Sequence, residues 1–299
     1  MTREPLVDRL LRLRIMAETF LNYPRGRLRA RTLSARNRRS SSSVTGHAPL
    51  IVSLTSYGGR IDTVHLTIES LAGGSVRPRR LILWLDDAER FATLTPGLRR
   101  LQERGLEIRL TENLGPYTKF FPTLAELDDD DLLVTADDDL LYPATWLARL
   151  VEAQSTEPDL VHCYRARDIV VEDGTLAPYA RWRLSLSTTA SFHRFATGVS
   201  GVIYPRTVIE ALRAAGDAFR QTAPRADDIW LHVMSVTAGA RIRQMSRSPR
   251  HFPLVPRSQK VTLYSSNLTQ GANDPQIAAT YPPEVIARIA ADAQSEERR

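Results

Sequence analysis

Three adjacent carboxylates are the feature of this sequence that most strongly suggests chemistry. Asp137, Asp138 and Asp139 directly follow the apolar run 132–136, which we expect to be a buried strand. Adjacent carboxylates repel one another unless a cation or a positively charged ligand lies among them. Capping of a helix ahead of Pro143 would explain one of these aspartates well but three poorly. We therefore expect a site for Mg²⁺ or Mn²⁺, which prefer hard oxygen ligands.

The apolar patterning indicates the elements that must position these aspartates. Short apolar runs alternate with segments of helical periodicity, which predicts parallel strands joined by right-handed crossovers in an open α/β sheet. The expected strands cover residues 50–54, 81–85, 106–110 and 132–136, and the expected helices cover 61–71, 96–103, 117–127 and the segment after 143. The second half is less regular, with expected strands at 160–164, 169–171 and 199–204, a tight turn at 173–174, helices at 208–214 and 229–236, and an exposed helix at 282–299.

Polar residues that follow the predicted strands are the candidate site residues, because ligands of open α/β sheets bind beyond the carboxyl ends of the strands. In strand order they are Thr55, Ser56 and Tyr57, then Asp86 and Asp87, then the loop 113–119 with Lys119, and then Asp137 to Asp139. A second acidic run, 128–131, precedes the fourth strand. We expect that run to be a solvated turn.

The positive charge of the chain is concentrated in an N-terminal arm. The chain of 299 residues has a net charge of +6, but residues 1–47 alone carry +8, so the remainder is slightly acidic. This distribution argues against nucleic-acid binding by the globular body. The arm combines a short amphipathic helix, the arginine-rich segment 25–39 and a serine-rich linker at 40–46. We expect it to contact an anionic membrane or a partner, with a solvated helix and a flexible tail as the alternative.

Several other classes of protein find no support. A single cysteine, Cys163, excludes an internal disulfide and a cysteine-based zinc site. The sequence has no apolar run long enough to cross a membrane, no Gly-x-Gly-x-x-Gly, no phosphate loop and no Gly-x-Ser-x-Gly. We expect a cytoplasmic protein, peripheral at the inner face of the cell membrane if the arm binds lipid.

The order of the motifs resembles the nucleotide-binding half of GT-A glycosyltransferases, of the bacterial family 2 type. The resemblance covers about residues 48–235. It is carried by the strand at 50–55, the paired aspartates 86–87, Asn113-Leu-Gly115, the Asp-x-Asp motif at 137–139 and the acidic motif at 226–231. It implies a single GT-A, Rossmann-like domain with an open, mostly parallel sheet flanked by helices.

The resemblance also implies roles for individual residues. Asp86 or Asp87 would recognise the base of a nucleotide sugar, with Thr55 and Tyr57 lining its pocket. Asp137 and Asp139 would hold the ribose and the divalent ion that bridges the diphosphate, with Asp138 between them and His251 as a late metal ligand. Asp228 would be the catalytic base, with Asp227 as the second candidate, and Lys119 would meet a phosphate or an acceptor anion. An alternative stays open for each of these residues. Asp86 or Asp87 would be an ordinary turn aspartate, and Asp227 and Asp228 would be first-turn carboxylates favoured by the helix dipole. Lys119 would be a surface lysine, and His251 a packed histidine.

Together these features predict an inverting, metal-dependent glycosyltransferase. It would move a sugar from a nucleotide-diphospho-sugar donor to a hydroxyl of a glycan or lipid-linked glycan acceptor in bacterial surface polysaccharide synthesis. Residues 48–160 would bind the donor, 161–260 would bind the acceptor and supply the base, and 261–299 would form a tail and helix. Two alternatives remain: a sugar nucleotidyltransferase, and a non-enzymatic module that binds a divalent cation or a partner.

Overall fold

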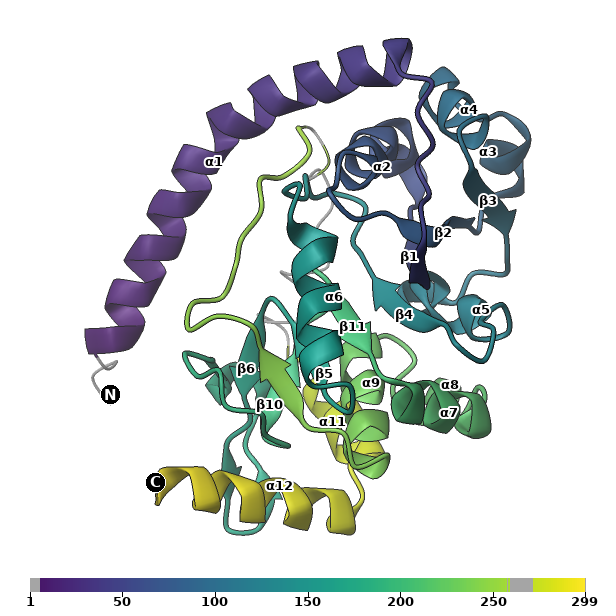
Figure 1. Ribbon diagram of the computed structural model, residues 1–299. Coiled ribbons are helices and arrows are strands. Elements are labelled where there is room, and N and C mark those ends of the chain that lie inside the picture. Colours follow the sequence, from purple (N-terminus) through teal and green to yellow (C-terminus); the bar gives the residue numbers. More distant parts are fainter. Residues whose placement is uncertain (1–5, 257, 259–270, 299) are drawn as a thin grey trace.

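A seven-stranded, mostly parallel sheet forms the centre of the protein (Figure 1). The computed structural model describes residues 6–256, 258 and 271–298. In spatial order the strands are β12 (Ile242–Gln244), β5 (Val161–Cys163), β11 (Val202–Tyr204), β4 (Leu132–Thr135), β1 (Ala48–Thr55), β2 (Pro78–Leu85) and β3 (Leu106–Leu110). Neighbouring strands run parallel, except that β11 is antiparallel to both β4 and β5. The predicted α/β class with an open, mostly parallel sheet is thus confirmed.

The first half of the chain alternates strand and helix as predicted. Its helical elements are η1 (Gly58–Asp62), α2 (Val64–Ala72), α3 (Ala88–Ala92), α4 (Pro96–Gln102), η2 (Gly115–Lys119), α5 (Phe121–Leu124) and α6 (Trp146–Thr156). The short helix α3 is not predicted by apolar periodicity, since its five residues include no buried side chain. Asp87 caps its N-terminus by accepting a hydrogen bond from the Arg90 backbone N–H at 3.0 Å.

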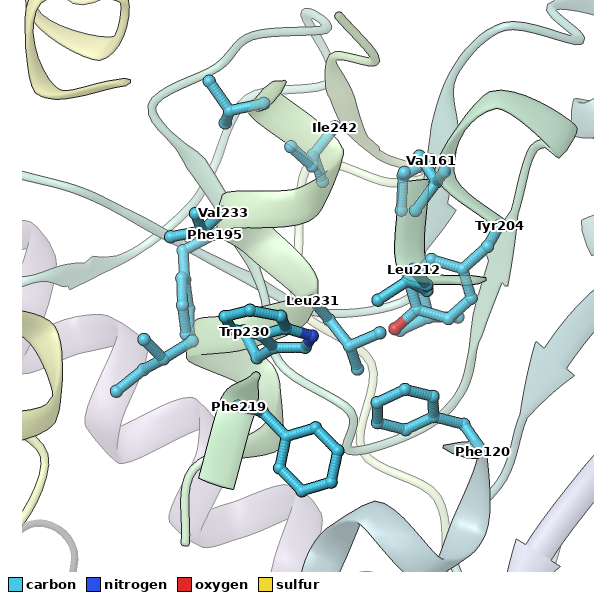
Figure 2. Close-up of a cluster of buried hydrophobic side chains, with 14 of the residues drawn as sticks. Phe120, Val161, Phe195, Tyr204, Leu212, Phe219, Trp230, Leu231, Val233 and Ile242 are labelled. Atoms are coloured by element: carbon cyan, nitrogen blue, oxygen red, sulfur yellow. The ribbon is translucent and has the colours of Figure 1, made fainter. Parts of the chain in front are cut away.

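Both faces of the central strand β1 are buried, which explains why its sequence is a continuous apolar run. Leu50, Val52 and Leu54 pack into one hydrophobic cluster, together with side chains of α2, α4 and α6. Ile51 packs into the cluster on the other face. Figure 2 shows part of that second cluster, in which Trp230 and Leu231 lie among Phe120, Tyr204, Phe219 and other apolar side chains.

The second half adds smaller elements around the sheet. They are β6 (Ala166–Asp168), β7 (Val171–Glu172), β8 (Thr175–Leu176), η3 (Tyr179–Arg181), β9 (Arg183–Leu184), β10 (Arg194–Ala196), α7 (Arg206–Ala215), α8 (Phe219–Thr222) and α9 (Asp227–Thr237). The strands β10, β6 and β9 form an antiparallel sheet of their own. The predicted strand at 169–171 is wrong in position, because Ile169 and Val170 lie between β6 and β7. The predicted turn at Asp173 and Gly174 is confirmed, and both residues have positive φ angles.

The N-terminal segment differs both from the expected short helix and from the alternative of a flexible tail. Residues Leu6–Arg39 form one helix, α1, that includes Pro24 and lies along the outside of the molecule (Figure 1). Asn37 is buried and donates hydrogen bonds to Glu69 Oε1 at 3.0 Å and to the Gly97 carbonyl at 3.1 Å. Residues 25–39 therefore form a docked helix, because their inner face has buried polar and apolar partners on the body. Among the described helices, none is both long enough and apolar enough to cross a membrane.

Two other sequence expectations need correction. Asp131, in the acidic run expected to be solvated, is fully buried and pairs with Arg79 at 2.5 Å. The C-terminal helices are α11 (Asp274–Thr280) and α12 (Pro283–Glu297), and α12 is not simply exposed, since Val285 and Ile289 are buried in the core. The expected boundary between residues 260 and 261 lies outside the described residues.

Candidate functional site

The residues predicted at the strand ends meet along one edge of the sheet. β4, β1 and β2 are neighbours and run parallel, so their carboxyl ends lie together. Asp137 follows β4, Lys119 ends η2 after β3, and Asp227 and Asp228 form the first turn of α9. These four side chains interact with one another, although they come from three distant parts of the sequence.

Lys119 is the cation at the centre of this group. Its Nζ lies 2.7 Å from Asp227 Oδ2 and 4.0 Å from Asp137 Oδ1, and only 12% of its side chain is exposed. Burial by itself would lower the pKa of Lys119, but Asp227, Asp137 and Asp228 more than offset this and raise it. Lys119 is therefore a charged, nearly buried ammonium group, and the alternative of an ordinary surface lysine is excluded by its environment.

Asp228 lies beside this ion pair and has a different environment from Asp227. Its Oδ1 accepts a hydrogen bond from the Gly198 backbone N–H at 2.9 Å. Burial and the neighbouring Asp227 charge raise the pKa of Asp228 to about 7, while Lys119 and the Gly198 hydrogen bond act in the opposite direction. A carboxylate with this pKa can accept a proton near neutral pH and retain it better than an ordinary aspartate.

Gly198 fits this site because it has no side chain. A Cβ atom at this position would lie 2.9 Å from Lys119 Nζ and 3.0 Å from Asp228 Oδ1. Both distances are shorter than normal van der Waals contacts, so the lysine or the aspartate would have to move. Gly198 was not among the predicted site residues, because its loop before β11 carries no motif and reaches the site only through the tertiary fold.

The N-terminus of α9 is held by Tyr117, another residue that the sequence analysis did not single out. The Tyr117 hydroxyl donates to the carbonyls of Ala223 and Ala226, the latter at 3.3 Å. Its ring stacks on Phe219 with centroids 3.8 Å apart. Ala226 directly precedes Asp227, so these contacts fix the backbone from which both aspartates project. The signal that could have indicated Tyr117 is its place in the loop 113–119.

Asp137 is the carboxylate of the acidic run that faces Lys119. Its backbone N–H donates to the Tyr142 hydroxyl at 2.8 Å, and its side chain is 23% exposed. Burial, opposed by Lys119 and reinforced by Asp139, Asp138 and Asp228, raises the pKa of Asp137 to about 7. Burial is the main cause of this raised pKa, and the neighbouring carboxylates add a smaller contribution that a bound cation would relieve.

Asp138 and Asp139 pair instead with Arg60, a residue of η1. Asp138 accepts from Ser56 Oγ at 2.6 Å and from Arg60 at 2.9 Å, and Thr67 donates to its backbone carbonyl at 2.8 Å. Asp139 lies 3.3 Å from the same Arg60 nitrogen. Asp138 therefore joins β1, η1 and α2 to the end of β4. Arg60 was not among the predicted site residues, and its signal is its position directly after Gly58 and Gly59 in η1.

The remaining candidate residues do not join the charged group: Thr55, Tyr57, Asp86 and Asp87 follow β1 and β2, and His251 lies in a coil late in the chain. Thr55 donates to the Trp84 carbonyl at 3.0 Å, and Tyr57 is 37% exposed with the Arg60 guanidinium 5.3 Å from its ring centroid. Asp86 is half-buried after β2, next to the capping residue Asp87. His251 is half-buried in a coil, and its carbonyl accepts from Asn22 at 3.3 Å.

The expected metal ligands do not form a ready-made cage. Within the described part of the chain, no three His, Cys, Asp or Glu side chains lie close enough to hold an ion together. A three-ligand set of Asp137, Asp139 and His251 is thus not assembled in this structure. A cavity of about 720 Å³ is lined by residues such as Arg241, Arg243, Asp292 and Glu296 and includes none of the candidate residues.

Comparison with known proteins gives no family for this chain. No family model matches it, and no curated protein matches its sequence. Among solved structures, it is similar to a mannosyltransferase, PcManGT from Pyrobaculum calidifontis in complex with GDP-Man and Mn²⁺, with 13% identity, a TM-score of 0.48, and 97% of this chain and 86% of that chain covered. It is also similar to 4-diphosphocytidyl-2C-methyl-D-erythritol synthase from Anaerococcus prevotii, with 12% identity, a TM-score of 0.42, and coverage of 68% and 88%. At these identities and TM-scores neither similarity decides what this chain does, so its function is inferred from its own site.

Proposed function

We propose that this chain is an inverting glycosyltransferase that moves a sugar from a nucleotide-diphospho-sugar donor to a hydroxyl acceptor. The observation that carries the proposal is the group formed by Lys119, Asp137, Asp227 and Asp228 at the carboxyl edge of the sheet. Such an edge is where ligands bind in open α/β sheets. The group combines a fixed cation with two carboxylates whose pKa is about 7.

Asp228 is suited to act as the general base. Transfer with inversion requires a group that takes the proton of the acceptor hydroxyl while that oxygen attacks the sugar carbon. The pKa of Asp228, near 7, makes it a stronger base than an ordinary aspartate while it stays substantially ionised at neutral pH. The Gly198 N–H fixes the orientation of this carboxylate by binding one oxygen and leaving the other to face the acceptor.

Lys119 is suited to stabilise the leaving group. The departing nucleoside diphosphate carries negative charge, and a preoriented ammonium group in a nearly buried site stabilises such charge strongly. Asp227 holds the lysine at 2.7 Å, so in this proposal Asp227 positions Lys119 and Asp228 takes the proton. The donor base and ribose would lie further along the edge, near Thr55, Tyr57, Asp86 and Asp87.

A divalent cation fits the residues present. The donor set is composed of carboxylate oxygens, which Mg²⁺ and Mn²⁺ prefer, and the nearby charges of Asp139 and Asp138 add to the effect of burial in raising the pKa of Asp137. Asp137 and Asp139 would hold Mg²⁺ or Mn²⁺, which commonly binds through one or two carboxylates and completes its shell with substrate phosphates. When bound, the ion would neutralise charge on the diphosphate.

The acceptor side follows from the same arrangement. Residues 161–260 supply Gly198 and Asp228, so we propose that this half receives the glycan or lipid-linked glycan acceptor, while residues 48–160 hold the donor. Bacterial surface polysaccharide synthesis is the biological role that we propose, at a cytoplasmic location.

Thermal shift with nucleoside diphosphates tests the donor site. We expect UDP or GDP to stabilise the protein only with Mn²⁺ or Mg²⁺ present, and Asp137→Asn to remove that dependence. Asp129→Asn is the matched control, since Asp129 is 98% exposed and precedes β4 at its opposite end. Equal stabilisation with and without the ion would contradict the metal assignment.

Transfer assays test the base. Asp228→Asn retains the size and the Gly198 contact but cannot accept a proton, so transfer should fall by roughly 100-fold or more while donor binding persists. Incorporation of a nucleoside monophosphate from a triphosphate onto a sugar phosphate, without sugar transfer, would instead identify a nucleotidyltransferase.

A further inference from the structure

The outer face of α1 combines exposed arginines with exposed apolar side chains. We define this outer face as Tyr23, Arg27, Leu28, Arg31 and Arg38, all of which are exposed. At 100° per residue, Arg27, Arg31 and Arg38 lie within about 40° of one another around the helix axis. Figure 1 shows α1 running along the outside of the molecule, so this face is presented to the surroundings.

The opposite side of the helix uses its arginines for a different purpose. Arg29 donates to the carbonyls of Leu141 and Tyr142, and Arg36 donates to the Ala72 carbonyl at 3.0 Å and lies 3.5 Å from Glu69. These two side chains are half-buried against the body. The helix thus divides its arginines into a docking set, which contacts the body, and an outward set, whose side chains are exposed.

The two apolar side chains of the outer face, Tyr23 and Leu28, are strongly exposed to solvent. Leu28 is 68% exposed and Tyr23 is 65% exposed, the highest values among the large hydrophobic side chains that the structure describes. The Arg27 guanidinium lies 5.8 Å from the centroid of the Tyr23 ring. Aromatic and aliphatic side chains next to arginines are typical of helices that lie in the headgroup region of a bilayer.

We propose that the outer face of α1 docks on an anionic lipid bilayer. Residues 22–39 contain no acidic residue and seven arginines, of which Arg29 and Arg36 bind the body, so the charge of the outward arginines complements an anionic leaflet. The bilayer is favoured over a nucleic acid, because Tyr23 and Leu28 have an apolar medium to enter only in the bilayer. The docking is independent of the catalytic proposal, since no residue of the outer face belongs to the candidate site.

Vesicle binding by the full chain tests the proposal. Wild type should bind vesicles of phosphatidylglycerol mixed with phosphatidylcholine, and bind phosphatidylcholine alone weakly. Arg27→Gln, Arg31→Gln and Arg38→Gln together should weaken binding roughly 100-fold, the combined effect of three basic side chains near an anionic surface. The matched control replaces Arg99, Arg247 and Arg298, exposed arginines outside α1, by glutamine and removes the same charge. Its binding should change little.

A second variant separates insertion from simple charge attraction. Tyr23→Ser with Leu28→Ser should remove the part of the binding that survives at high ionic strength, where exposed charges are screened. Leu186→Ser, at a side chain that is 39% exposed, is the control. Thermal unfolding of each variant should match wild type, because these side chains face outward. The proposal would be overturned if the α1 and control arginine variants lost vesicle binding equally. It would also be overturned if the protein bound RNA as well as vesicles and this binding did not depend on Tyr23 and Leu28.

Discussion

Gly198 sets the spacing between the two charged groups that we assign to chemistry. Gly198→Ala would place a Cβ 2.9 Å from Lys119 Nζ and 3.0 Å from Asp228 Oδ1. The lysine end is flexible and can move, so we expect thermal unfolding close to wild type but transfer reduced between roughly 10- and 100-fold, as for other small misplacements. Gly59→Ala is the control, since nothing lies within 4 Å of a Cβ there. Unchanged transfer by Gly198→Ala would show that Lys119 and Asp228 need no fixed spacing.

Lys119 compensates the charge of three carboxylates, so its removal should lower the stability of the fold. Lys119→Met should destabilise the fold by about 3 kcal/mol, the lower end of the cost of leaving a buried ion pair without one partner. The loss should be larger at about pH 8 than at about pH 5.5, because Asp137 and Asp228, with pKa values of about 7, are ionised only at the higher pH. Urea unfolding at both pH values measures this difference. A loss that is independent of pH would mean that the lysine compensates Asp227 alone.

At the scale of elements, His232 joins α9 to the C-terminal helices. Its Nε2 donates to the Phe192 carbonyl at 3.0 Å, and its Nδ1 accepts from the Tyr281 hydroxyl at 2.8 Å, between α11 and α12. Burial lowers the pKa of His232 to about 4. The buried ring is therefore neutral and satisfied on both nitrogens.

This histidine predicts acid sensitivity of the C-terminal packing. The unfolded chain takes up a proton below about pH 6.5 whereas the folded chain does not until about pH 4, so stability is full above pH 6.5 and is lost as the pH falls toward 4. The loss should approach about 3 kcal/mol. His232→Gln cannot titrate and should show a smaller decrease over this window in urea unfolding. Parallel pH profiles for the two proteins would contradict the assignment.

The elements that could be predicted are those whose sequences have a clear period. The runs that form the inner strands β1, β2 and β4 are apolar because both faces of the sheet are covered there, whereas the edge strand β3 alternates apolar and charged residues, and the predicted positions of all four agree with the structure. Strands of two or three residues, such as β9 and β12, have no measurable period, and their positions depend on tertiary contacts.

The residues of the candidate site also differ in how well the sequence predicts them. Asp137, Lys119 and Asp228 could be found because they follow strands or begin a helix. Gly198 could not, because it acts through its missing side chain. Tyr117 lies in a loop that the sequence marks, but its role depends on contacts with residues more than one hundred positions away.

At the scale of the whole molecule, α1 links the surface to the candidate site. Arg29 binds the Leu141 and Tyr142 carbonyls, and the Tyr142 hydroxyl accepts the backbone N–H of Asp137 at 2.8 Å. Ala30 and Leu33 pack in a small cluster with Leu66, Leu141 and Val255. Although its sequence is that of a basic N-terminal arm, α1 therefore supports the loop after β4.

Removal of α1 should consequently affect both stability and the site. Deletion of residues 1–39 takes away the apolar contacts of Leu33 and the buried partner Asn37 of Glu69, which together should cost roughly 4 kcal/mol in urea unfolding. It should also weaken nucleoside diphosphate binding, because the loop that carries Asp137 loses its contact with Arg29. Deletion of residues 1–21 is the control, since it leaves Asn22 and the contacts from Arg29 to Asn37 in place. If the two deletions have the same stability and the same nucleotide affinity, α1 only rests on the body; if the longer deletion alone loses both, the helix is an integral support of the site.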